Sequence, residues 1–83
     1  MDEYTYEKIL DSLEAADFNF FDESITDIID DYDDLTGLEI PLEEGFLDAT
    51  DIKVLLDIAE DNEATLELFN DDDGVMTMGF YVE

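Results

Sequence analysis

The stretch TDIIDDYDDLTG, residues 26–37, decides which fold this chain is predicted to have. Apolar side chains recur there with the period of a helix, at Ile28, Ile29, Tyr32 and Leu35. This spacing predicts an amphipathic helix over residues 23–36. Asp22 or Ser24 would cap its first turn, and Gly37 would end it.

The same stretch places four aspartates at the carboxyl end of that expected helix, where the macrodipole is negative and Lys or Arg is preferred. They are Asp30, Asp31, Asp33 and Asp34. If they oppose a helix dipole, removing their charges should leave the fold intact or more stable. Their placement therefore indicates a role other than stability.

The whole chain has the same charge bias. Its 83 residues contain 27 Asp and Glu and two Lys, which gives a formal net charge of −25. Such acidity is typical of disorder, but Leu, Ile, Val and Phe supply 26 of the 83 residues, above the roughly 20% below which disorder is expected. We predict one compact domain, residues 1–83, with a radius of gyration of about 12 Å.

Further elements are predicted on both sides of the opening stretch. A first helix is expected over residues 3–17 and a third over residues 51–61, with Thr50 as its cap. Residues 64–69 and 75–82 alternate in polarity around a polar turn, which predicts an antiparallel β-hairpin. The predicted fold class is therefore α+β: about three amphipathic helices followed by a C-terminal antiparallel hairpin, without internal repeats. Residues 38–40 could add a third short strand.

Acidic side chains fall on one face of each of the first two expected helices, opposite the apolar stripe. Like charges at this spacing destabilise a helix by about 0.2–0.5 kcal/mol per pair. An exposed Tyr among these acids would be a suitable interface anchor. The candidate partner-binding residues are Glu3, Glu7, Asp11, Glu14, Glu23, Asp27, Asp30, Asp31, Tyr32, Asp33 and Asp34.

Small size, extreme acidity, scarce cations and rows of carboxylates together resemble the phage-encoded DNA-mimic inhibitors. That class includes anti-restriction proteins, some anti-CRISPR proteins and inhibitors of uracil-DNA glycosylase. The resemblance lies in composition and charge pattern alone, without a shared motif. It implies an inhibitor that occupies the DNA-binding groove of a host defence or DNA-processing protein, such as a CRISPR effector or a restriction enzyme.

Two alternatives remain open. GLEIP at residues 37–41, followed by Thr50 before another helix, looks like the stretch after the second helix of acyl carrier proteins. In that family a Ser at the start of the second helix carries phosphopantetheine, and here Ser24 stands nearest to that place, within a different motif. The other alternative is an acidic chaperone for basic proteins.

Catalysis is not expected. The chain has no His or Cys, and neither Ser12 nor Ser24 has an evident base. No cofactor or metal site is assigned. The expected partner is a basic DNA-binding protein of the host, because nucleic acid and anionic membranes would repel this chain. An acidic start, MDEYTYEK, predicts no signal peptide and a place in the host cytoplasm, as a monomer or small homo-oligomer.

Overall fold

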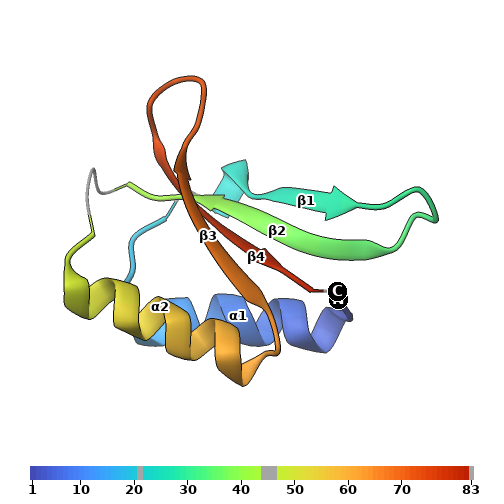
Figure 1. Ribbon diagram of the computed structural model, residues 1–83, viewed down its shortest axis with the longest axis horizontal. Helices are drawn as coiled ribbons and strands as arrows, with labels where there is room; N and C mark the ends of the chain where they lie inside the picture. The colour runs from blue at the N-terminus through green and yellow to red at the C-terminus, as the bar shows by residue number, and fades with distance from the viewer. Residues whose placement is uncertain (21, 44–46, 83) are drawn as a thin grey trace.

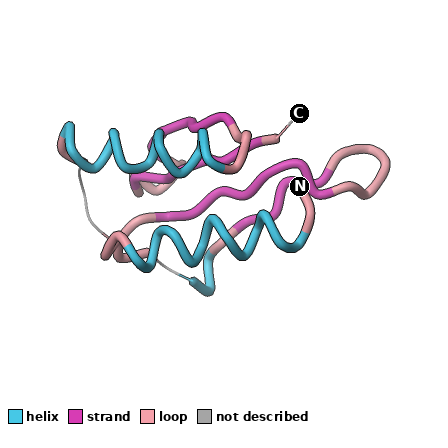
Figure 2. Tube along the Cα trace, turned by 90° about the horizontal axis from the view of Figure 1, so that it is seen from below, coloured by secondary structure: helices cyan, strands magenta, loops and turns pink. Residues whose placement is uncertain are grey.

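A computed structural model describes residues 1–20, 22–43 and 47–82 (Figure 1). In chain order the elements are helix α1 (Glu3–Ala15), a short 3-10 helix η1 (Asp22–Ser24), β1 (Thr26–Ile29), β2 (Leu35–Pro41), α2 (Ala49–Asp61), β3 (Thr65–Asn70) and β4 (Met76–Tyr81). The strands form one antiparallel sheet in the order β1-β2-β4-β3, and both helices pack on one face of it (Figures 1 and 2). The radius of gyration is 12.1 Å, as predicted.

The expected fold of three helices and a terminal hairpin is wrong, because residues 23–36 do not form a helix. They hold the end of η1, all of β1, a tight turn and the start of β2. Two physical reasons favour this outcome. β1 is rich in β-branched residues, which fit a pleated sheet. The carboxylate of Asp30 accepts hydrogen bonds from the backbone N–H groups of Tyr32, at 2.8 Å, and Asp34, at 3.0 Å, which fixes a turn.

The remaining elements differ less from expectation. α1 ends at Ala15, two residues early, and α2 begins at Ala49 with Asp48 as its cap, where Thr50 was expected. The side chains of Asp48 and Asp51 form a reciprocal capping box. The C-terminal hairpin exists as β3 and β4, while residues 38–40 lie inside β2, a central strand of the sheet.

The hydrophobic core lies between the two central strands and the helices. Leu38 pairs with Phe80 and Ile40 with Met78, and all four side chains are fully buried. Against them pack buried residues of both helices, namely Ile9, Leu13, Leu55, Ile58 and Ala59. Burying side chains of this size contributes about 1.5–3 kcal/mol each. This core fixes the two helices, which carry part of the acidic surface, against the sheet.

The chain is built as two αββ units, which the sequence analysis did not predict. α1, β1 and β2 form the first unit, and α2, β3 and β4 form the second. The units meet at the β2–β4 pair, where Gly37 faces Tyr81 and Glu39 faces Gly79. Glu39 and Tyr81 thus hold equivalent places, each two residues after a glycine. The two helices run antiparallel in Figure 1, as an approximate two-fold axis through the sheet requires.

The helix-free face of the sheet has its own polar contact at this axis. The Tyr81 hydroxyl donates to a carboxylate oxygen of Glu39 at 2.6 Å. A Cβ atom added at Gly37 or Gly79 would meet the Tyr81 side chain at 2.7 and 2.4 Å. Both glycines are therefore required so that the ring can lie across the strands.

Candidate protein-binding surface

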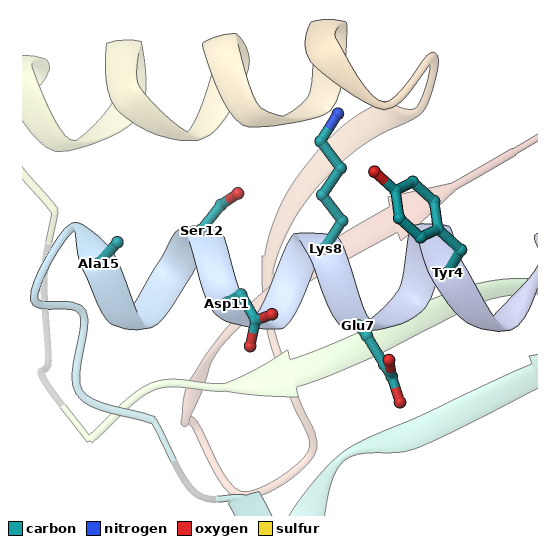
Figure 3. Close-up of a pocket in the computed structure, with 6 residues that line it drawn as sticks. All are labelled: Tyr4, Glu7, Lys8, Asp11, Ser12 and Ala15. Carbon is teal, nitrogen blue, oxygen red and sulfur yellow. The ribbon is translucent and has the colours of Figure 1, made fainter.

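The acidic row predicted for the first helix is present on α1. Its four members are exposed, and they are Glu3, Glu7, Asp11 and Glu14. Figure 3 shows Glu7 and Asp11 extending from one side of α1, while Lys8 and Ser12 extend from the side nearer α2. Lys8 therefore extends away from these two carboxylates (Figure 3).

The second acidic row does not exist as a row, because its members lie on three different elements. Glu23 is in η1 and Asp27 is on β1, while residues 30–34 form the β1–β2 turn. Asp30 can no longer be counted as a carboxylate opposing a helix dipole, since it stabilises the turn. The expectation that removing this group of charges would leave the fold unharmed is therefore wrong for Asp30.

The sheet brings Asp27 to α1. Asp27 pairs with Leu38, so its side chain is on the helix-covered side of the sheet, beside Tyr6. Burial raises the pKa of the Tyr6 phenol, and the Asp27 carboxylate raises it further as a hydrogen-bond acceptor and as a charge. Asp27 also lines one groove together with Glu3 and Glu7. Three of the predicted residues are thus assembled at one place.

The β1–β2 turn presents Tyr32 as the most exposed large hydrophobic side chain of the described residues, with 84% of its surface accessible. Asp31, Asp33 and Asp34 surround it and are exposed. Since a tyrosine side chain gives a large contact area with little loss of entropy, and the backbone of this turn is hydrogen-bonded, Tyr32 is suited to anchor a partner.

Three acidic residues occupy backbone conformations that favour glycine. Asp17, Asp33 and Glu63 have φ values of 62°, 62° and 54°. Asp33 is one of the predicted binding residues, whereas Asp17 and Glu63 are not. Each of these two follows a helix by two residues, where Gly or Asn is the usual choice. For Glu63 the predicted end of the helix at residue 61 was the available signal, whereas Asp17 was predicted to lie inside the helix over residues 3–17.

The helix ends show the unfavourable charge that residues 30–34 were expected to show. Neither α1 nor α2 has a basic residue in its last turn. α2 ends with Glu60 and Asp61, followed by Glu63, and α1 ends with Glu14, followed by Asp17. Acidic groups there are unfavourable by about 0.3–1 kcal/mol when exposed at low salt. Acids at the carboxyl end of a helix are thus a real feature of this molecule, on other helices than predicted.

The charge density exceeds that of duplex DNA along the longest dimension. The molecule measures 35 × 28 × 19 Å and carries a net charge of −25. At one charge per ~1.7 Å, duplex DNA needs about 42 Å to carry as much. The net charge per unit length is therefore at least that of duplex DNA.

Comparison of the chain with protein-family models, with curated proteins and with solved structures finds no match. Neither α1 nor α2, the α-helices of the described part of the chain, is long and apolar enough to cross a membrane. Within residues 1–20, 22–43 and 47–82, no three acidic side chains come together as a metal site requires. The acyl-carrier resemblance loses its structural basis, because Ser24 ends η1 and does not open a second α-helix.

Proposed function

We propose that this protein is a DNA-mimic inhibitor, which occupies the basic DNA-binding groove of a host defence or DNA-processing protein and prevents that protein from binding DNA. The observation that carries the proposal is the presence of acids at the positive φ angles of residues 17, 33 and 63. A side chain in this conformation costs on the order of 1–3 kcal/mol, which Gly avoids. Carboxylates at such places do not help this fold, whereas a partner that recognises negative charge benefits from them.

The ordered position of the acids supports a mimic over an acidic chaperone. The candidate residues lie on a helix that packs on the core, on a strand paired with β2, on a 3-10 helix and on a hydrogen-bonded turn. A chaperone for basic proteins can use a disordered acidic tail, because it needs charge without a fixed arrangement. A DNA-binding groove requires negative groups at set positions, because its basic side chains are placed to contact phosphates.

The proposal is tested by displacement with DNA. The tagged protein is immobilised, exposed to a nuclease-treated bacterial lysate and then eluted with duplex DNA. We expect the eluted protein to be a basic DNA-binding protein. In fluorescence anisotropy, the inhibitor should displace labelled duplex from it, and this competition should weaken steeply as salt rises. Capture of proteins that duplex DNA does not release would contradict the proposal.

Two matched variants locate the contact surface, and each removes three charges. E7Q/D11N/D27N alters α1 and β1, and D57N/E60Q/D61N alters α2. At about 0.5–1 kcal/mol per lost pair, the first should weaken competition about 10- to 100-fold. The second should weaken it less, if the contact is made by the first αββ unit. Equal losses would mean that net charge alone, and no particular surface, is responsible for inhibition.

A further inference from the structure

A groove with a partly apolar lining lies between α1 and the first two strands. Its volume is about 600 Å³, within the range of ordinary ligand sites. Tyr6 and Leu10 of α1 and Leu35 of β2 provide its apolar floor, and each is partly buried. Such a floor is suited to a hydrocarbon segment and not to a bare ion.

The rim of this groove is anionic. Glu3 and Glu7 contribute from α1, and Asp27 contributes from β1 across the groove. Met1 also lines it, and its amino group donates to the carbonyl oxygen of Leu35. Three carboxylates and one ammonium leave the rim with a net charge of −2. The groove therefore offers an apolar surface beneath a negatively charged opening.

Asp27 is on a paired strand, and its exposed carboxylate lies beside the hydroxyl of Tyr6, a partly buried residue. A carboxylate next to a tyrosine is a suitable receptor for a planar cation, which can hydrogen-bond to the oxygens and lie on the ring. The remaining carboxylates, Glu3 and Glu7, are one helical turn apart on α1.

We propose that this groove binds an arginine side chain of the partner protein. The methylene stem would lie on Leu10 and Leu35, and the guanidinium would lie between Asp27 and the two glutamates. Arginine fits better than lysine, because its head is planar, weakly hydrated and able to bind carboxylates with two parallel hydrogen bonds. Arginine is also a principal phosphate contact of DNA-binding proteins. The identity of the partner rests on the proposed function, whereas the guanidinium site does not.

The site is tested on the full-length protein with n-butylguanidinium as the probe. We expect amide shifts in a ¹⁵N–¹H spectrum to be localised at residues 6, 10, 27 and 35. Guanidinium without a stem and n-butanol without a charge should each bind at least fivefold more weakly. E7Q/D27N should weaken probe binding about tenfold, and E3Q/E7Q provides a second variant on exposed helix positions. D57N/E60Q removes the same charge on α2, outside the groove, and should change affinity less than twofold.

Shifts spread evenly over the acidic surface, or equal losses in E7Q/D27N and D57N/E60Q, would overturn the site. Competition with DNA separates this proposal from the proposed function. If E7Q/D27N loses the probe but competes with DNA as well as the parent protein, the arginine assignment is wrong and the mimic function stands. If the parent binds the probe and never competes with DNA, the proposed function is wrong and the partner's arginine is excluded with it.

Discussion

The two hairpin turns share one backbone geometry and differ in the residues that make it. In residues 30–34 and residues 71–75, the first residue is Asp, and its N–H donates to the carbonyl of the fifth at 3.0 Å. Asp30 accepts from the backbone N–H groups two and four residues later at 2.8 and 3.0 Å, and Asp71 does so at 2.8 and 2.9 Å. The fourth residue has positive φ in both turns. Here the second turn has Gly74 and the first has Asp33.

This difference separates what the fold requires from what it tolerates. The first Asp is required in both turns, since its carboxylate satisfies two backbone N–H groups. A carboxylate at the fourth position is not required, because Gly74 adopts the same conformation at φ 80° without strain. The first turn also carries Tyr32 at its third position, where the second has Asp73. The extra charge and the aromatic ring of the first turn are therefore candidates for function.

The largest loss of stability is expected when the first Asp of either turn is replaced. D30A and D71A each remove an anionic acceptor of two hydrogen bonds, which should lower the free energy of unfolding by about 2 kcal/mol. D30N and D71N keep a side-chain oxygen and should recover most of it. Urea denaturation checks all four variants. Parent-like stability of D30A would mean that the Asp30 contacts do not stabilise the turn.

A smaller effect is expected at the axis that relates the two units. Y81F removes the hydrogen bond to Glu39 and should cost about 1 kcal/mol at pH 7. Burial, together with Glu39 as acceptor and charge, raises the pKa of Tyr81 far above its usual range. The unfolded chain ionises this phenol near pH ~10 while the folded protein does not, so stability is complete below that pH and is lost above it. Melting curves from pH 8 to 11 should fall more steeply for the parent than for Y81F, and parallel curves would contradict this.

Exchange of the fourth residue between the two turns tests how much an acidic residue at positive φ costs in stability. D33G should raise the free energy of unfolding by about 1 kcal/mol, and G74D should lower it by a similar amount. An added Cβ at Gly74 meets no atom within 4 Å, so backbone conformation alone is expected to cause the loss. Denaturant midpoints of both variants and of the double exchange provide the measurement. Opposite signs are required. A stability gain from G74D would show that the turns are not equivalent.

The smallest effect on stability is expected at the third turn position, where the two turns should differ in their effect on binding. Y32S and D73S should each change the free energy of unfolding by less than about 0.5 kcal/mol, because both side chains are exposed. Only Y32S should weaken competition with DNA, by about tenfold, as loss of an aromatic anchor does. If Y32S and D73S compete with DNA equally well, Tyr32 is not part of the contact surface.

Sequence periodicity was sufficient for α1, α2 and the β3–β4 hairpin, and it failed for β1 and the start of β2. α1 and the hairpin of β3 and β4 each offer enough residues for a period of 3.6 or 2 to show. β1 has four residues, and its pairing with β2 shifts register: Ile28 faces Gly37, and the next residue, Ile29, faces Leu35. Thr36 is thus an extra residue in β2. This bulge interrupts the alternation of inward and outward side chains along β2. The apolar residues of the two strands and the turn between them therefore recur with a spacing like that of a helix.

The candidate surface shows the same limit. The acids of α1 could be placed from sequence because one helix fixes their relative positions. Bringing Asp27 to Glu3 and Glu7 depends on the pairing of β1 with β2 and on the packing of the sheet against α1, which are long-range contacts. Asp17 and Glu63 were missed for another reason. Both residues have a positive φ angle, which Gly in a sequence would predict but Asp or Glu does not.

The pairing of β2 with β4 also has a consequence for how fast the chain folds. Leu38 and Phe80 are 42 residues apart in sequence, whereas Ile28 and Gly37, within the first hairpin, are nine apart. Closing the longer loop costs about 1.4 kcal/mol more in chain entropy. We expect both hairpins to form first and the joining of the units to limit the folding rate. In stopped-flow experiments, most of the loss in unfolding free energy of D30A should then appear as a lower refolding rate constant. If D30A refolds at the parent rate and unfolds faster, the hairpin forms after the rate-limiting step.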